Sequence, residues 1–146
     1  GDSLDGTMRR IAARFVTWMD APQGGHRAPG NACLAGCRAL KDGAHWSQAG
    51  GATAGGCGSV MRAYPFGLIF ADDLELAETW AVAHSYLTHG DPIAQAACAA
   101  MAVGIGLAMQ GKLALPAGGV FDLADITDAV KASLTPGRNG KILLRP

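Results

Sequence analysis

The chain has 146 residues, of which 16% are charged, and its 12 acidic and 12 basic side chains cancel to a formal net charge of zero. A chain of this length can bury a hydrophobic core as one domain. The balanced charge provides no strongly basic surface, so no nucleic-acid partner is expected. Four cysteines in a chain without a signal peptide or the composition of a small disulfide scaffold indicate reduced thiols and a cytoplasmic location.

The first half of the chain predicts three helices separated by glycine-rich turns. Apolar residues at three-to-four spacing predict an amphipathic helix over 4–20. A second helix is predicted between Asn31, which can serve as its N-cap, and Gly43, which follows its end. A third is predicted over 59–70, with a kink at Pro65.

Two longer helices are predicted in the second half. Asp72 and the glutamate three residues later have the order of a variant capping box, before a helix that extends to about residue 87. Asp91 as N-cap, with proline at the first helical position, predicts a helix over 92–110. Its apolar run, 93–109, is shorter than the ~20 residues of a membrane span. We therefore expect a buried central helix and no membrane partner.

The end of the chain predicts only a weaker helix over 123–134, capped by Asp122 or closed by Pro136. No window alternates with period two over five residues, so an all-α fold is expected. The chain starts without methionine and ends abruptly, which predicts that 1–146 is a single domain or a fragment of something longer.

A glycine-rich loop is the most informative stretch. Gly55, Gly56 and Gly58 come just before the Ser59 hydroxyl and a predicted helix, where backbone amides can hold a phosphate or sugar hydroxyls. The loop is neither a Walker loop nor a dinucleotide fingerprint. Its composition is equally compatible with a plain tight turn. Arg62 could add positive charge to such a cradle or pair with an acid across a helix interface.

Two histidines and two cysteines are further candidates. His84 lies on an apolar helix face and is predicted to be a core residue. His89, in a turn that leads into a helix, is better placed to reach a ligand. Cys33 and Cys37 lie one helical turn apart and could offer two metal ligands, but we interpret them as small buried apolar residues.

Three motifs in this order, "RAPGNACLAGCRAL", "GGCGSVMRAYPFGL" and "AHSYLTHGDPIAQAACAA", resemble the ADP-ribosylglycohydrolase family, the group that includes dinitrogenase reductase-activating glycohydrolase. The resemblance covers about residues 5–112. The remainder, 113–146, holds the weaker helix and a basic tail.

The resemblance implies a compact multi-helix fold that binds ADP-ribose or an ADP-ribosylated protein and two magnesium or manganese ions. Such enzymes hydrolyse the N-glycosidic bond to a modified arginine, or an O-linked bond to another residue, and the metals lower the pKa of the attacking water. By this resemblance His89 hydrogen-bonds the ligand, and the loop residues that line it are Gly55, Gly56, Cys57, Gly58, Ser59 and Met61.

The chain departs from the family in its acidic motifs. The Thr-Asp-Asp-Thr motif near the family's start and the Asp-x-Asp-Thr/Ser motif near its end do not occur, and Ala32 replaces a common threonine. No metal ligand or catalytic residue is therefore assigned. We expect a segment that lacks the N- and C-terminal parts of the family fold and binds no metal alone.

Two alternatives stay open at this point. One is a relative that binds ADP-ribose or a nucleotide without hydrolysing it, and the other is a helical interaction module whose glycines serve packing. A bundle without its first and last elements would expose apolar faces around Phe15, Trp18 and Trp80. Association with itself or with the missing segments is then expected.

Overall fold

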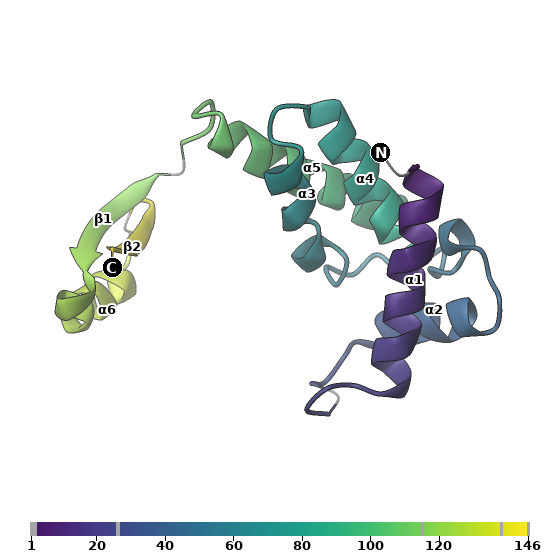
Figure 1. Cartoon of the computed structure of the whole chain (residues 1–146). Helices are drawn as coiled ribbons and strands as arrows, with labels where there is room; N and C mark the ends of the chain where they lie inside the picture. Colours follow the sequence, from purple (N-terminus) through teal and green to yellow (C-terminus); the bar gives the residue numbers. More distant parts are fainter. Residues whose placement is uncertain (1–2, 26, 115, 138, 146) are drawn as a thin grey trace. The chain divides into compact units, whose positions relative to one another are not determined.

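The computed structural model describes residues 3–25, 27–114, 116–137 and 139–145. The chain divides into two compact units, Gly1–Gln110 and Gly111–Pro146. The first unit is helical (Figure 1) and consists of α1 (Leu4–Asp20), α2 (Asn31–Lys41), two short 3-10 turns (Trp46–Gln48 and Val60–Arg62), α3 (Tyr64–Ile69), α4 (Leu74–Ser85) and α5 (Pro92–Met109). The second contains β1 (Ala117–Asp122), a 3-10 turn (Leu123–Asp125), α6 (Ile126–Leu134) and β2 (Lys141–Arg145).

Side-chain caps explain where three helices of the first unit begin. The Ser3 hydroxyl accepts a hydrogen bond from the third residue beyond it at the start of α1, at 3.1 Å. Asp73 does the same for α4 at 3.0 Å. Asp91 Oδ1 accepts from the amide of Ile93 at 2.8 Å, with Pro92 in the first turn of α5. Each cap satisfies an amide that the helix itself leaves unpaired. The predicted helix over 4–20 and the predicted start at Asp91 are confirmed.

Three predicted boundaries are wrong. Asn31 is the first residue of α2, and Gly30 precedes it without a side-chain cap. The cap of α4 is Asp73 and not Asp72. The segment predicted as one helix over 59–70 is a 3-10 turn followed by α3, because Pro65 has no amide hydrogen and fits best in the first turn of a helix.

The core of the first unit is made largely of small side chains. α4 and α5 lie side by side (Figure 1), and the buried cluster between them and their neighbours includes Met8, Ala81 and Cys98. Gly67 of α3 faces α5 so closely that an added methyl group would collide with the carbonyl oxygen of Ala102. Small residues therefore let these helix backbones approach each other directly.

α5 is less buried than the sequence predicts. Its fully buried residues form one stripe that faces the core, and they are Ala94, Cys98, Ala102 and Gly106. By length and composition, α5 is the one helix in the described part of the chain that could cross a membrane. Of its 18 residues, 22% are buried inside the structure. The predicted buried central helix is therefore buried along one stripe only.

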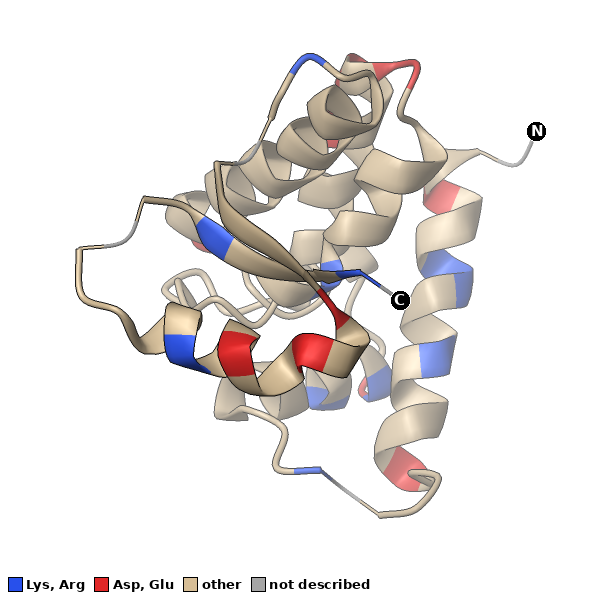
Figure 2. Cartoon of the chain, turned by 90° about the vertical axis from the view of Figure 1, so that its left-hand side faces the viewer, with Lys and Arg blue, Asp and Glu red and all other residues tan. Residues whose placement is uncertain are grey.

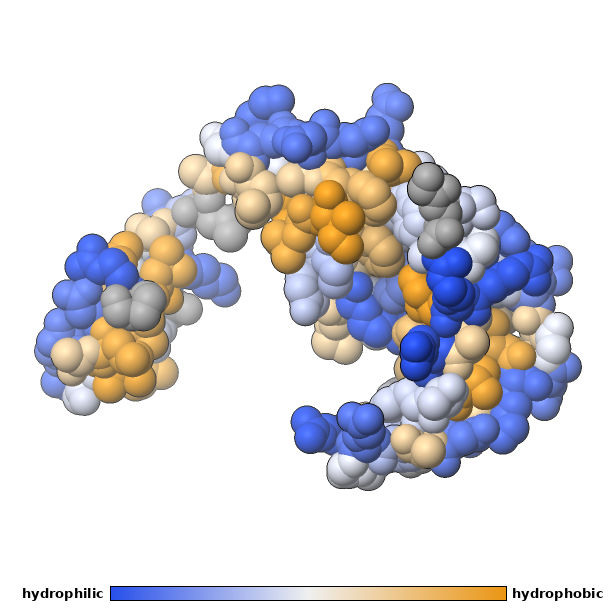
Figure 3. Space-filling model, in the orientation of Figure 1, coloured by the Kyte–Doolittle hydropathy of each residue, from blue (hydrophilic) through white to orange (hydrophobic). Residues whose placement is uncertain are grey.

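Apolar side chains are exposed elsewhere than predicted. Phe15, Trp18 and Trp80 are all half-buried. Apolar residues gather instead over α3 (Figure 3), where Ile69 is 70% exposed, and on α5, where Ile93 is 74% exposed. Self-association stays a prediction.

The second unit corrects the predicted all-α class. β1 and β2 pair in parallel, and α6 packs against both strands. Within the two strands, only Gly119, Phe121 and Ile142 are partly buried, and the other residues are exposed. The strands are short, and β1 contains two glycines, which have no side chain to mark a buried face, so the sequence did not reveal the strands. The chain is mostly helical with a small parallel sheet.

Candidate functional site

The glycine-rich loop is fixed to the turn between α4 and α5. The Gly50 amide donates to the carbonyl oxygen of Tyr86 at 2.7 Å, and the Gly90 amide donates to that of Gly51 at 3.0 Å. Gly51 also forms an isolated parallel bridge with His89. These bonds hold the loop against the turn that carries His89, although more than thirty residues separate the two in sequence.

The imidazole ring of His89 packs directly against Gly58. The histidine is only 3% exposed, and a methyl group added at Gly58 would lie 2.9 Å from its Cε1 and 3.0 Å from its Nε2. On the other side of the ring, Nδ1 lies 2.8 Å from Thr88 Oγ1, which accepts a hydrogen bond from Arg62 Nη2 at 2.6 Å. Burial, and then the Arg62 charge, lower the pKa of His89. The ring is therefore neutral at pH 7.

The loop residues divide into exposed and interior positions. Gly55, Gly56 and Cys57 are exposed. No described residue accepts a hydrogen bond from the amides of Gly56, Cys57 and Gly58, so these donors are available to a ligand. Ser59 is completely buried, and its hydroxyl accepts from Cys98 Sγ at 3.3 Å. The structure thus places Ser59 inside the core, where it supports the loop.

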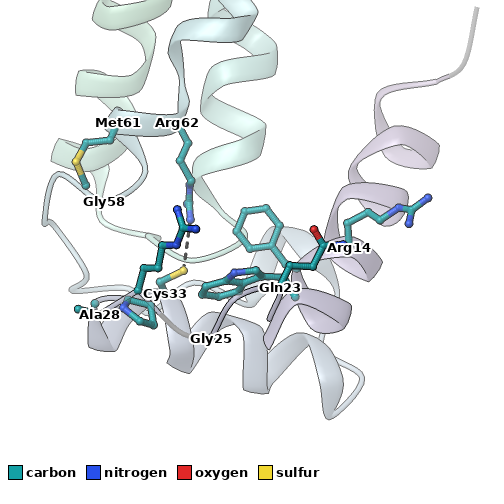
Figure 4. Close-up of a pocket in the computed structure, with 13 residues that line it drawn as sticks. Arg14, Gln23, Gly25, Ala28, Cys33, Gly58, Met61 and Arg62 are labelled. Carbon is teal, nitrogen blue, oxygen red and sulfur yellow. Dashed lines mark hydrogen bonds between the residues drawn. The ribbon is translucent and has the colours of Figure 1, made fainter. Parts of the chain in front are cut away.

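A pocket of about 770 Å³ opens beside this loop (Figure 4). Two of the residues predicted to bind ligand, Gly58 and Met61, form part of its wall, and Met61 is 67% exposed. The other residues that line the pocket come from the end of α1, the loop after it, the start of α2 and the 3-10 turn before α3: Arg14, Phe15, Trp18, Gln23, Gly25, Arg27, Ala28, Pro29, Gly30, Cys33 and Arg62. Gly55, Gly56, Cys57, Ser59 and His89 are not among them.

The pocket is positively charged. Its described lining residues include three arginines and no aspartate or glutamate. The Arg62 guanidinium lies 4.8 Å from the centroid of the Phe15 ring, and Figure 4 shows it reaching toward Cys33. Arg14 directs its guanidinium away from them in the same view. α1 carries basic residues along its middle and acids near its two ends (Figure 2).

The carboxylate of Asp91 lies near the Gly55 end of the loop, opposite the Gly58 end that borders the pocket. An added methyl group at Gly55 would lie 3.3 Å from Cγ of Asp91, which also caps α5. A carboxylate repels a phosphate and an arginine attracts it. A negatively charged ligand is therefore favoured at the Gly58 end of the loop, beside Arg62.

Cys33 is the nucleophilic side chain of the pocket. All four cysteines are free thiols. Cys33 is half-buried, and its Sγ accepts from Arg62 Nη1 at 3.5 Å. Interaction with the neighbouring Cys37 thiol, together with the Arg62 charge, holds the pKa of Cys33 well below its usual value. Cys37 is buried, and interaction with Cys33, followed by burial, raises its pKa. The interpretation as a small buried residue fits Cys37 but not Cys33.

Sequence reasoning missed most of the pocket wall. The sequence predicts Phe15 and Trp18 as apolar residues of a helix face that mediates association, and not as the wall of a pocket. Arg27 and Cys33 flank the Pro-Gly turn before α2, and basic and thiol side chains on both sides of such a turn are the pattern that could have drawn attention to them. Within the described part of the chain, Arg62 pairs with no acid, which was one of its two predicted roles, and instead donates to Cys33 in the pocket wall and to the buried Thr88.

The described residues do not fit a two-metal centre. Over residues 3–25, 27–114, 116–137 and 139–145, no three His, Cys, Asp or Glu side chains lie close enough together to hold a metal ion. The pocket offers guanidinium groups, aromatic rings, backbone amides and one thiol, which suit an anionic organic ligand.

The chain was compared with family models, curated proteins and solved structures. The model of the ADP-ribosylglycohydrolase family matches residues 1–140. No curated protein and no solved structure matched. Because the family model covers nearly the whole chain, the chain belongs to the ADP-ribosylglycohydrolase family.

Proposed function

We propose that this chain supplies the ADP-ribose-binding wall of a metal-dependent hydrolase that removes ADP-ribose from modified proteins, with ADP-ribosyl-arginine as the substrate linkage. Membership of the family implies substrates related to ADP-ribose. The observation that carries the proposal is the meeting of Gly58 and Met61, two residues expected to bind the ligand, with two aromatic rings and several arginines around one pocket.

The diphosphate fits the positive end of the pocket. It carries two negative charges, which the guanidinium groups of Arg27 and Arg62 can bind through charge-assisted hydrogen bonds. The adjacent amides of Gly56, Cys57 and Gly58 add neutral donors. The carboxylate of Asp91 disfavours the diphosphate at Gly55, so the loop binds it through its Gly58 end.

The adenine fits the aromatic side of the same pocket. Phe15 and Trp18 lie one turn apart on α1 and both line the cavity. Stacking of a base on an aromatic face contributes about 1–3 kcal/mol. A pocket of about 770 Å³ is in the size range that encloses a ligand of this kind.

His89 positions the loop from beneath. We assign its ring hydrogen to Nε2, because the Arg62 bond to Thr88 Oγ1 turns the threonine hydroxyl to donate toward Nδ1. The Nε2–H group then acts as a hydrogen-bond donor close to Gly56 and Gly58. Because the histidine is neutral, its contribution to ligand binding does not depend on its becoming charged.

The family is typically metal-dependent, whereas this sequence lacks the two acidic motifs of the family. The proposed role of this chain is therefore to bind and orient the ADP-ribosyl group, and its described residues contain no cluster of side chains that would hold the metal ions. Binding without hydrolysis is the outcome expected for this chain by itself.

Isothermal titration calorimetry with ADP-ribose, in buffer that contains EDTA, tests this role. We expect saturable binding, and we expect Arg27→Gln to weaken it by about tenfold or more, because a charge-assisted hydrogen bond is lost. Arg38→Gln is the matched control, since Arg38 is exposed on α2 and does not line the pocket, and the affinity of this variant should stay close to the original value.

The same titration separates the alternatives. Equal losses in the two arginine variants would show that general positive charge, and not the pocket, binds the ligand. No heat at millimolar ADP-ribose would favour the helical interaction module. An assay for release of ADP-ribose from ADP-ribosylated arginine, with magnesium or manganese added, would detect hydrolysis, and turnover by this chain would overturn the binding-only role.

A further inference from the structure

The pocket contains a thiol in an unusual charge environment. Cys33 lines the cavity, its Sγ lies 3.5 Å from Arg62 Nη1, and no acidic residue is among the described lining residues. Cys37, one turn further along α2, is fully buried. Of these two neighbouring thiols, only Cys33 can be reached by a molecule in the pocket.

These surroundings favour the thiolate, which is the reactive form of a cysteine. A guanidinium group stays positively charged at every physiological pH and stabilises a negative sulfur beside it. The arginines also raise the local concentration of anions, and they lower that of cations by the same physics. A reagent that is negatively charged should therefore reach Cys33 more readily than a positively charged one.

We propose that Cys33 is a modification site that reacts with anionic low-molecular-weight disulfides, of the kind represented by glutathione disulfide. The Cys33 thiolate attacks one sulfur of the disulfide, so that a new Sγ–S bond forms as the reagent's own S–S bond breaks. The departing thiolate takes the electron pair of that bond and is protonated by solvent. Cys33 is oxidised, and the departing half of the reagent is reduced.

The reaction stops at this mixed disulfide. A disulfide between Cys33 and Cys37 needs Cβ atoms at about 3.5–4.5 Å, whereas positions four apart on a helix hold them at about 5–6 Å. Cys37 is also buried, with a raised pKa, so it is a poor attacking thiol. The adduct therefore remains in the pocket until an external thiol removes it, and it occupies the cavity while it is present.

The test is a comparison of two disulfides of opposite charge on the full chain. Glutathione disulfide is anionic and cystamine is cationic at neutral pH. Cys57 is the internal reference, because it is exposed and does not line the pocket. Modification of each cysteine is followed over time by quenching, digestion and mass spectrometry. The rate ratio of Cys33 to Cys57 cancels the different intrinsic reactivities of the two reagents.

We expect Cys33 to react faster than Cys57 with glutathione disulfide. We also expect the Cys33-to-Cys57 ratio to be about tenfold or more higher with glutathione disulfide than with cystamine. Raising the salt concentration to about 1 M should reduce this difference, because it shortens the screening length to about 3 Å. Arg27→Gln should lower the ratio for glutathione disulfide, and Arg38→Gln, which removes an exposed arginine outside the pocket lining, should leave it unchanged.

Equal ratios for the two reagents, or faster reaction at Cys57 with glutathione disulfide, would overturn the assignment. Cys33→Ser, checked for native structure by circular dichroism, should lose the fast adduct, and Cys57→Ser should keep it. Because the probe is a disulfide and the readout is mass, the result does not depend on whether the pocket also binds ADP-ribose.

Discussion

Glycines in the same loop differ in the space around them. Gly58 is in contact with the ring of His89, whereas a methyl group added at Gly56 would meet only Nε2 of that ring, at 4.0 Å. Neither has a positive φ, so alanine is compatible with the backbone at both positions. At Gly58 it is therefore the close approach of the histidine, and not an unusual backbone conformation, that requires glycine.

Alanine substitution separates these two positions. Gly58→Ala places a methyl group 2.9 Å from His89 Cε1, which forces the ring or the loop to move. We expect this variant to unfold in urea with a free energy of unfolding lower by about 1–3 kcal/mol. Gly56→Ala should change it by less than about 0.5 kcal/mol. Equal stability of the two variants would contradict the packing of Gly58 on His89.

At the scale of helices, one aspartate decides where α4 begins. Asp72 and Asp73 are neighbours, and both are exposed. Only Asp73 accepts a hydrogen bond from the amide of Leu76, at 3.0 Å, in the extended conformation typical of an N-cap. The start of α4 matters for the site, because the other end of this helix leads into the turn of His89.

A pair of alanine variants tests this assignment. Asp73→Ala should lower the free energy of unfolding by about 1 kcal/mol, because an orphan amide loses its partner. Asp72→Ala removes the same charge one residue earlier and should have a much smaller effect. Urea unfolding followed by circular dichroism measures both, and a larger loss for Asp72→Ala would return the cap to the position that the sequence predicted.

At the scale of the whole molecule, the first unit is organised around a buried histidine. His84 is 4% exposed and packs against the rings of Phe15 and Phe66, so it joins α1, α3 and α4. Its Nδ1 is buried without a hydrogen-bond partner in the described part of the chain. Burial, and then the positive charge of Arg62, lower the pKa of His84 to about 3. Folding therefore requires the neutral ring.

This depressed pKa predicts that acid destabilises the protein. Below the ordinary value of 6.5, the unfolded chain binds a proton at His84 that the folded chain does not bind until about pH 3. The stability that the neutral His84 ring contributes is therefore fully present above pH 6.5 and is lost as the pH falls toward 3. Between pH 7.5 and pH 5, protonation of His84 in the unfolded chain should by itself lower the free energy of unfolding by about 2 kcal/mol. The lowered pKa of His89 acts in the same direction.

His84→Leu should flatten this dependence, because it removes the titrating group. Urea unfolding at pH 7.5 and pH 5 gives the two free energies. His45→Gln serves as the control, since it removes a histidine whose side chain is 36% exposed and should leave the acid loss in place. An unchanged pH dependence in His84→Leu would show that other groups cause the acid sensitivity.

The sequence by itself determined the long helices, the start of α5 and the family. These features depend on local patterns: apolar spacing in α1, the Asp-Pro start of α5, and motifs that are continuous in the chain. Each is read within one segment, without knowing what that segment contacts. The prediction of His84 as a core residue succeeded for the same reason, because it lies on an apolar helix face.

Only the tertiary structure decided the pocket and the surroundings of its residues. Arg62 and Cys33 are 29 positions apart, and their contact exists because α2 and the 3-10 turn before α3 meet at one cavity. Ser59 lies in the core and Gly58 rests on His89 for the same reason. The sequence also did not reveal the strands of the second unit, since both are short and most of their residues are exposed. The partners of a residue and the charge beside it depend on which distant segments surround it, and local patterns carry no information about which segments those are.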